Sequence, residues 1–491
     1  MRKLFNFFAA ALVMLAAASC EKNEVLPDNN SEGKVVTLKA SINNGGTKTS
    51  LGQGVWEEGE PKVYPVLWSE GDAIAVIQSG IIYKFNLTEG ANSTSGTFTL
   101  DETKTYSTPF NSTGEIKAFY PFKDVSLDGE TIKYKVPATQ TYTTTVLDEV
   151  AYSTFGKGAS PMAAYRAAGA TSVLTFDNLF GVLKLQLKGA EGEKVKTIEV
   201  LSKNIAISGN GSTVVIEPEN SSIILPTVDN TTNRVILNCG NGGVDISSTT
   251  EFLISIPQAQ NPHDFVVTID TDKGVYYKET SQTIQSGNIL KMEELDLAIF
   301  ENKMSFVENG VYLGEGIAQP EGSDNQFVWA PVNCGYTNEN KYGLLYKFGS
   351  NSGISYNGTI PTTISYGNSC PVGWRVPTSQ ELGTLSLESN YKSTLKQVEG
   401  VSGLYFYLDK SKSESEKIFL PAAGMLKVEA FADPIFCYKD ASCVYWSSTK
   451  KVGTQQAYYL IASKPGTYYS SQLLYGTQAH AESVRCVRDV Q

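Results

Sequence analysis

From Val35 to about Leu297 the chain consists of short segments in which apolar and polar residues alternate with period two. Clear examples are Ile81–Leu87, Thr131–Val136 and Leu183–Lys188. A strand places successive side chains on opposite faces of a sheet, so each segment can cover a core on one side and meet water on the other. The pattern predicts antiparallel β-sandwiches without a long helix in this part of the chain.

Turn-forming residues separate these segments, at Asp128-Gly129, Gly209-Asn210-Gly211 and Asp272-Lys273-Gly274. Gly274 is free to take a positive φ between two strands, because glycine adopts that conformation without steric cost. A stretch rich in Gly, Ala and Ser, from Tyr152 to Thr171, is the best candidate for a boundary between two domains. It divides the region into two predicted sandwiches, residues 35–160 and 161–300.

The N-terminal residues predict export. Arg2 and Lys3 precede a mostly apolar run that ends at Ala18, which is too short to span a bilayer comfortably. The run leads into Cys20 in a sequence, Leu15 to Cys20, that resembles a bacterial lipobox. This resemblance implies a signal peptide over residues 1–19 and a lipidated Cys20 that anchors the protein in the outer membrane. The alternative is an ordinary secretory peptide cleaved nearby.

Residues 20–34 are polar and rich in turn-forming residues, and they are predicted to form a flexible tether. Lipid chains on Cys20 would then be the protein's attachment to the membrane, since no other apolar run reaches spanning length.

The composition excludes several classes of function. The chain has 491 residues, which is enough for about three domains, and a formal net charge of −11. An acidic surface argues against binding to a phosphate backbone, so no nucleic-acid partner is expected. Only 2 histidines are present, which leaves little material for His-dependent catalysis or His-rich metal sites. The sequence predicts a binding or structural protein without cofactor or metal.

Enzymatic activity is not expected. The pairs His480 with Glu482 and His263 with Asp264 are neighbours in sequence, and neither accompanies a nucleophile motif. No phosphate loop or dinucleotide fingerprint is present.

Five segments of the first 300 residues form a recognisable set: Thr47–Leu51, Leu67–Val76, Leu174–Leu183, Ile205–Gly209 and Phe252–Pro257. Together they resemble the fimbrillin-like (Mfa-like) proteins of Bacteroides-type bacteria. It implies two tandem transthyretin-like β-sandwiches from a surface pilus subunit, anchor or tip protein. Trp68 and Asp72 lie within it, and we expect them to be a core aromatic and a turn acid.

In that family a protease cuts after an arginine that follows the first strand, and a neighbouring subunit donates a strand to the opened groove. The matching stretch here offers Lys48 instead of arginine, which puts processing at this site in doubt. The physical basis for strand donation is unaffected, because a sheet that lacks an edge strand exposes unpaired backbone groups.

From about residue 301 the pattern changes, and six motifs follow in order: Asn333–Gly335, Tyr342–Tyr346, Cys370–Thr378, Leu420–Gly424, Tyr445–Ser448 and Ser483–Arg488. Together they closely resemble the Fibrobacter succinogenes major paralogous domain. The resemblance implies a C-type-lectin-like α+β domain over residues 301–491. Within it, Thr378 followed three residues later by Glu381 independently predicts a capped helix start.

Fifteen pairings are possible among the six cysteines other than Cys20. The lectin-like resemblance implies that Cys370 and Cys486 lie close enough for a disulfide, which would contribute roughly 4 kcal/mol by closing a long loop. A second bridge, between Cys437 and Cys443, would close a short loop.

The lectin-like resemblance also raises the question of calcium and sugar. Calcium takes six to eight oxygen ligands. After Trp446, where a calcium-binding lectin often has Asn and Asp, this chain has Ser447 and Ser448, so we expect no calcium-dependent sugar site. Three nearby acids match no metal motif: Glu429, Asp433 and Asp440. Tyrosines that could stack on a sugar or peptide are Tyr438, Tyr458, Tyr459, Tyr468, Tyr469 and Tyr475.

Two hypotheses follow. The first is a pilus tip or accessory adhesin subunit, assembled with other pilus subunits by strand donation, with the lectin-like domain free to bind a glycan or host surface. The second is a standalone surface lipoprotein that binds a glycan and never polymerises. The ligand itself is not predictable from the sequence.

Overall fold

A computed structural model describes most of the chain. The described residues are 35–42, 67–129, 131–147, 150–217, 222–227, 232–257, 264–281, 283, 289–291, 295–299, 304–319, 326–363, 365–386, 395–408, 417–429, 432–463 and 470–490. The predicted signal peptide, Cys20 and Lys48 lie outside them. Among the described residues, no helix has the length and apolar character needed to cross a membrane.

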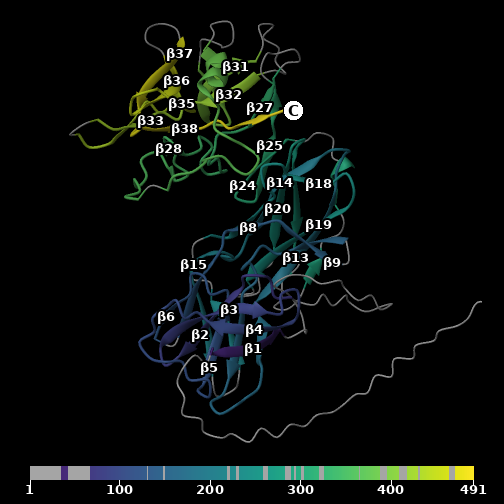
Figure 1. The fold of residues 1–491 in the computed structure, drawn as a ribbon. Helices are drawn as coiled ribbons and strands as arrows, with labels where there is room; N and C mark the ends of the chain where they lie inside the picture. Colours follow the sequence, from purple (N-terminus) through teal and green to yellow (C-terminus); the bar gives the residue numbers. More distant parts are fainter. Residues whose placement is uncertain are drawn as a thin grey trace, which may run out of the picture. The chain divides into compact units, whose positions relative to one another are not determined.

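Strands are the main element throughout the described residues, and the helices are short (Figure 1). The prediction of a mainly β protein is therefore confirmed.

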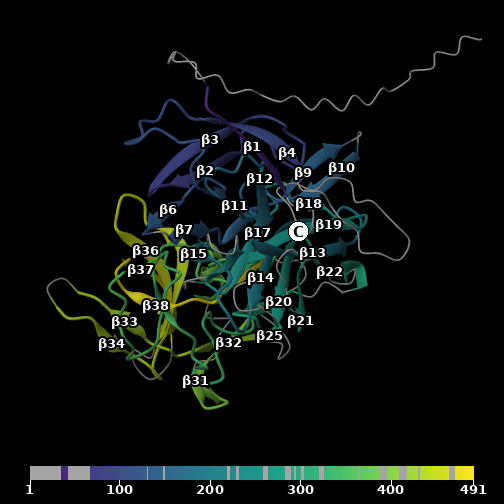
Figure 2. The ribbon, with the colours of Figure 1, turned by 90° about the horizontal axis from the view of Figure 1, so that it is seen from below.

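The N-terminal strands close into a barrel in which β1 lies between β4 and β12 (Figure 2). In spatial order its strands are β1 (Thr37–Ile42), β12 (Leu174–Asn178), β11 (Met162–Arg166), β5 (Ile116–Tyr120), β2 (Ala73–Gln78), β3 (Ile81–Glu89) and β4 (Ser95–Leu100). β11 and β12 follow residue 160, where the first sandwich was predicted to end. Their pairing with β5 and β1 extends this barrel to Asn178.

A second sheet joins strands from both sides of that predicted boundary. Its order is β16 (Ser222–Thr227), β15 (Gly209–Glu217), β7 (Thr131–Val136) and β6 (Ser126–Asp128). Ile132 and Tyr134 of β7 share one buried cluster with Phe119 of β5 and Ala163 of β11, so this sheet packs against the barrel.

Two further sheets form a sandwich around one core. The first has the order β19 (Thr250–Pro257), β13 (Phe180–Lys188) and β22 (Ile289–Lys291), with β23 (Leu295–Asp296) also on β13. The second has the order β21 (Val275–Thr280), β20 (Phe265–Thr271), β14 (Lys194–Ser202), β17 (Arg234–Asn238) and β8 (Thr139–Thr141), with β18 (Val244–Asp245) on β14. Leu185 of β13, Ile198 of β14 and Val267 of β20 are fully or almost fully buried in the shared core, because alternation turns every second side chain inward.

Smaller elements adjoin this sandwich. They are the hairpin of β9 (Thr143–Leu147) and β10 (Val150–Thr154), the 3-10 helix η2 (Leu297–Ile299), and the hairpin of β24 (Ser305–Glu308) and β25 (Val311–Glu315).

The described part of the C-terminal region combines three sheets with one short α-helix. The largest sheet holds β29 (Gly353–Ile354), β28 (Leu345–Lys347), β38 (Ala481–Ser483), β35 (Cys443–Lys450), β36 (Gln456–Ser463) and β37 (Ser470–Thr477), with β33 (Met425–Lys427) and β34 (Ile435–Cys437) attached through β38. The others are β26 (Ile317–Ala318), β27 (Phe327–Trp329) and β39 (Val487–Asp489), and β30 (Lys396–Val398), β31 (Val401–Tyr407) and β32 (Lys417–Pro421).

The helix α1 (Ser379–Gly383) begins as the sequence predicts and continues into the 3-10 helix η3 (Thr384–Ser386). The Glu381 amide donates to Thr378 Oγ1 at 3.2 Å, and the Thr378 amide donates to Glu381 Oε2 at 2.7 Å. This reciprocal capping box satisfies two amides that no helical carbonyl can reach. Leu382 is consequently held in the core of the C-terminal region.

Candidate functional site

The strand β1 closes the barrel with hydrogen-bond partners on both sides. It runs antiparallel to β4, with Thr37 opposite Thr99, and parallel to β12, with Ile42 opposite Phe176. The Ile42 amide also donates to the Thr94 carbonyl at 2.9 Å. Without β1, the facing edges of β4 and β12 would carry unpaired backbone groups, which is the arrangement that accepts an added strand.

The side chains of β1 suit a strand that closes the barrel. Leu38, Ala40 and Ile42 are buried and alternate with more exposed residues, so one face of the strand covers the core. Burying a leucine or isoleucine side chain contributes about 1.5–3 kcal/mol. A replacement strand therefore needs apolar side chains at the same three positions.

Trp68 and Asp72 support the barrel next to β1 and its two neighbouring strands. Trp68 is fully buried and makes edge-to-face contacts with Phe98, Tyr120 and Phe176. Asp72 accepts hydrogen bonds from the Ser69 amide at 2.7 Å and from Tyr120 Oη at 2.9 Å. They are the core aromatic and the turn acid expected from the sequence. Burial raises the pKa of Asp72, although these hydrogen bonds oppose the rise.

A second candidate site is a pocket of about 320 Å³ in the C-terminal region, with Phe348 and Trp446 in its wall. Its polar groups are mostly occupied within the protein. Arg375 donates two hydrogen bonds to Glu381, at 2.6 and 2.8 Å, and Asn368 Nδ2 donates to the Trp374 carbonyl at 2.7 Å. The pocket therefore offers aromatic surface more than free hydrogen-bonding groups.

The two serines after Trp446 also line this pocket, and backbone contacts hold them. Ser447 Oγ donates to the Tyr458 carbonyl at 2.8 Å and accepts from the Thr449 amide at 3.2 Å. The Ser448 amide donates to the Pro377 carbonyl at 2.7 Å. In the described part of the chain, no group of three or more His, Cys, Asp or Glu side chains is placed to hold a metal ion.

The structure does not bring the three candidate acids together as one ligand set. Glu429 forms an ion pair with Lys427, Asp440 accepts a hydrogen bond from Tyr342 Oη, and Asp433 is exposed.

The candidate tyrosines are dispersed. Tyr475 is 50% exposed, lies edge-to-face with Tyr458 and has Lys451 Nζ 3.2 Å from its ring centre. Tyr459 packs on Trp446, and Tyr438 is exposed. Tyr468 and Tyr469 lie outside the described residues.

The cysteines follow one of the two predicted pairings. Cys370 and Cys486 form a disulfide across a sequence separation of 116 residues. Cys437 and Cys443 are both free thiols, so the bridge predicted between them is wrong. The two cysteines lie on different strands. Cys437 lies opposite Met425 in the β33–β34 pair. Cys443 is buried in β35 and donates to the Leu420 carbonyl at 3.2 Å.

His480 and Glu482 lie near each other but make no hydrogen bond. Their closest atoms, Nδ1 and Oε1, are 4.0 Å apart, and neither Glu482 oxygen has a hydrogen-bond partner among the described residues. Burial raises the pKa of Glu482 well above its usual value and lowers that of His480. No nucleophile motif accompanies them. In the second pair, His263 with Asp264, the histidine lies outside the described residues.

Arg485 is a buried residue whose role the sequence motif does not reveal. Its guanidinium donates to the carbonyls of Ala330, Pro331 and Phe419 and to Asn333 Oδ1, at 2.6–3.0 Å. These bonds satisfy a charge that burial would otherwise make very costly. Burial still lowers the pKa of Arg485 to about 10. Arg485 therefore ties three separate segments of the C-terminal region together.

Comparison with models of protein families gives no match, and comparison with curated proteins gives none either. Solved structures provide remote likenesses. A candidate cell adhesion protein from Bacteroides uniformis is 15% identical, with 55% of this chain and 94% of the other covered and a TM-score of 0.33. A candidate cell adhesion protein from Bacteroides ovatus is 12% identical, with 54% and 93% covered and a TM-score of 0.34.

A fimbrial protein from Bacteroides ovatus is also similar, at 12% identity, with 92% of this chain and 99% of the other covered and a TM-score of 0.24. All three TM-scores are below 0.5, and we take no functional conclusion from them.

Proposed function

We propose that the protein is a surface-exposed lipoprotein that serves as a pilus tip or accessory adhesin subunit. In this proposal the barrel and the sandwich that follows it are the two transthyretin-like units, and the barrel accepts a strand from a neighbouring subunit. The C-terminal region is the C-type-lectin-like domain that contacts a glycan or host surface. Cys20 carries the lipid that brings the chain to the outer membrane.

The observation that carries the proposal is the position of β1. Six residues close the barrel between β4 and β12, and three of their side chains cover its core. Release of this one strand would leave a groove with a free backbone edge on each side and an apolar floor, which an incoming strand of the same alternation would fill.

The pairing of β39 bears on whether residues 487–489 can donate a strand. β39 is paired with β27, and the Val490 amide donates to the Gln326 carbonyl at 3.2 Å. Val487 and Arg488 are buried. Residues 487–489 are therefore committed to the C-terminal region and do not supply a donor strand in this conformation.

Lys48 favours the second candidate function, a standalone glycan-binding lipoprotein. If the processing protease requires arginine, β1 stays attached and the barrel stays closed. The aromatic pocket around Phe348 and Trp446 would then be the part that meets a ligand.

The mature N-terminus separates the two functions. Mass spectrometry of the protein from cells, with fractionation of fimbriae, should find a chain that starts after Ile42 in the fimbrial fraction. A lipidated chain that starts at Cys20, is monomeric and is absent from fimbriae would overturn the pilus proposal and support the alternative. A Cys20→Ala variant is the control for lipid attachment, and it should lose the lipid-dependent membrane fraction in either case.

A further inference from the structure

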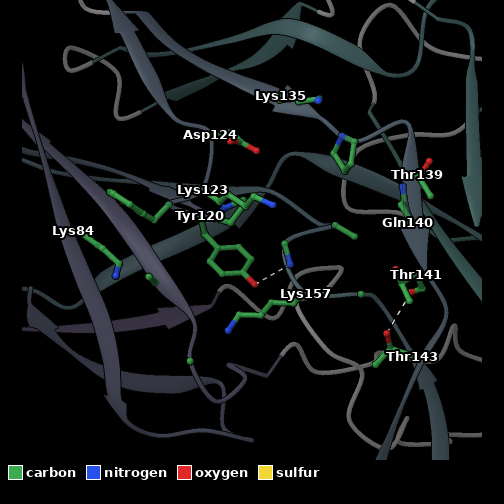
Figure 3. A pocket seen from close by; sticks show the side chains of 18 residues that line it. Lys84, Tyr120, Lys123, Asp124, Lys135, Thr139, Gln140, Thr141, Thr143 and Lys157 are labelled. Atoms are coloured by element: carbon green, nitrogen blue, oxygen red, sulfur yellow. Dashed lines mark hydrogen bonds between the residues drawn. The ribbon is translucent and has the colours of Figure 1, made fainter. Parts of the chain in front are cut away.

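A large pocket lies beside β8 and shares no lining residue with the aromatic pocket of the C-terminal region (Figure 3). Its volume is about 860 Å³, which falls in the range of small-molecule sites. Residues from the barrel line one side, and the segment from Pro137 to Thr143 lines another. We call it the lysine pocket, after Lys84, Lys123, Lys135 and Lys157 in its wall.

The charge of this pocket is opposite to that of the chain. Four lysines line it, and Asp124 is the acidic residue among its lining residues, although the protein as a whole carries a formal charge of −11. Lys84 is balanced by an ion pair with Asp101 at 2.9 Å. The other lysines leave a local excess of positive charge.

Three lysines are available to a ligand. Lys123 and Lys135 are exposed, and neither forms an ion pair with any residue that the structure describes. Lys157 Nζ donates to the Glu70 carbonyl at 3.2 Å, and its charge also acts on the buried carboxyl of Asp72, so Lys123 and Lys135 are the more available of the three. Ammonium groups are strongly hydrated point charges, and a concave site lined by low-dielectric walls strengthens their attraction for an anion.

Hydroxyl groups face the pocket from the opposite wall. Thr139, Thr141 and Thr143 are spaced two residues apart, so an extended chain puts their side chains on the same side. Figure 3 shows Thr139 and Thr141 close to Gln140 on the strand side of the pocket. The Gln140 side chain is already hydrogen-bonded to the backbone of Ser255. Gln140 Nε2 donates to the Ser255 carbonyl at 2.6 Å, and Gln140 Oε1 accepts from the Ser255 backbone amide at 3.0 Å.

The wall between the lysines and the hydroxyls is firmly held. Tyr120 Oη accepts from the Gly158 amide at 3.2 Å and donates to the buried Asp72 at 2.9 Å. Pro121 and Pro137 add apolar surface to the lining. The pocket thus combines cationic, hydroxyl and apolar surface, which is the mixture that recognises a charged sugar ring.

We propose that the lysine pocket binds an anionic carbohydrate through its carboxylate or sulfate groups. Lys123, Lys135 and Lys157 attract the anion, the threonine hydroxyls bond to sugar hydroxyls, and the prolines contact the faces of the rings. Thr143 Oγ1 donates to the Thr141 carbonyl at 3.3 Å, and the hydroxyls of Thr139 and Thr141 favour a carbohydrate over an acidic peptide. This proposal is independent of strand donation and of the C-terminal region.

Binding of defined oligosaccharides to the full chain tests the proposal. The probes are a uronic acid oligomer, a sulfated dextran oligomer of similar length, neutral dextran and poly-glutamate, each measured by calorimetry at low and high salt. At least one of the two anionic sugars should bind, and raising the salt should weaken it because screening reduces the attraction. Neutral dextran should not bind.

The double variant Lys123→Gln/Lys135→Gln should weaken that binding by about tenfold, since two exposed charges each contribute a modest amount. The matched control Lys188→Gln/Lys396→Gln removes two exposed lysines outside the pocket, so it should stay within about twofold. An equal loss of affinity in both double variants, or no binding of either anionic sugar, would overturn the assignment of the lysine pocket as the binding site. Equally tight binding of poly-glutamate would overturn the carbohydrate assignment.

Discussion

Glu482 is buried with both carboxyl oxygens unpaired among the described residues, and burial raises its pKa well above the usual value. In the unfolded chain its pKa is about 4.3. Between these two values the folded state holds a proton that the unfolded state has released. The free energy of unfolding therefore falls as pH rises through this range, by up to about 1.4 kcal/mol per pH unit.

Glu482→Gln removes this titration and keeps the shape of the side chain. We expect the variant to gain stability relative to the wild type as pH rises from about 4 to 7. Urea unfolding followed by tryptophan fluorescence at several pH values measures the difference. Glu399→Gln, at a carboxylate that is 71% exposed, is the control and should show no such trend. Parallel pH profiles for Glu482→Gln and the wild type would contradict this account.

Local sequence patterns predict some residue roles well and others poorly. The capping box of Thr378 and Glu381 was predictable because the interaction spans three residues. Gly274 does not use the positive φ that is open to it; a Cβ there would come within 2.9 Å of the Tyr276 ring. The four acceptors of Arg485 come from distant segments, so no local pattern reveals them.

At the scale of elements, alternation predicted many strands but not their partners. Period two shows which side chains face a core, whereas register and neighbour depend on residues far away in sequence. β1 pairs with β12, more than a hundred residues later, and β7 pairs with β15 across the predicted boundary. The aromatic pocket and the lysine pocket depend on such distant neighbours, which explains why the sequence did not locate them.

The replaceability of β1 can be measured directly. A specific protease site placed between residues 43 and 66 allows the folded chain to be cut without prior truncation. After cleavage, the protein should take up a fluorescent peptide with the sequence of residues 35–42, because the peptide restores both edges and the buried side chains. Fluorescence anisotropy measures the uptake.

The control peptide carries Leu38→Asp, Ala40→Asp and Ile42→Asp, which place charges against the barrel core, and it should not bind. Equal uptake by cut and uncut protein, or equal binding of the two peptides, would show that β1 is not an exchangeable closing strand.

At the scale of the whole molecule, one buried ion pair joins the C-terminal strand to the middle sandwich. Arg488 Nη1 lies 2.5 Å from Asp270 Oδ1, and Arg488 also donates to the Gly373 carbonyl at 2.8 Å. Both ionic side chains are largely buried. Loss of either partner would leave an uncompensated charge away from water.

Arg488→Met and Asp270→Asn should each lower the free energy of unfolding by about 3–5 kcal/mol. The double variant should cost less than the two single changes together, with a coupling of about 1–3 kcal/mol. Urea unfolding of the four proteins completes the cycle. The exposed pair Lys203 and Glu279 is the reference, and its coupling should be below about 1 kcal/mol. Additive effects at Arg488 and Asp270 would refute a direct interaction.

The attachment of β1 to the rest of the chain has a kinetic consequence. A covalently linked segment competes for its groove at a local concentration that reaches the millimolar range for short flexible linkers, and dilute rivals cannot match it. An intact molecule would therefore not bind a strand from another chain, even one that is complementary to the groove. If a neighbouring copy donates a strand, as proposed, cutting the backbone would remove this advantage at once, and hydrolysis of a single peptide bond would then set the earliest moment at which one copy could join another.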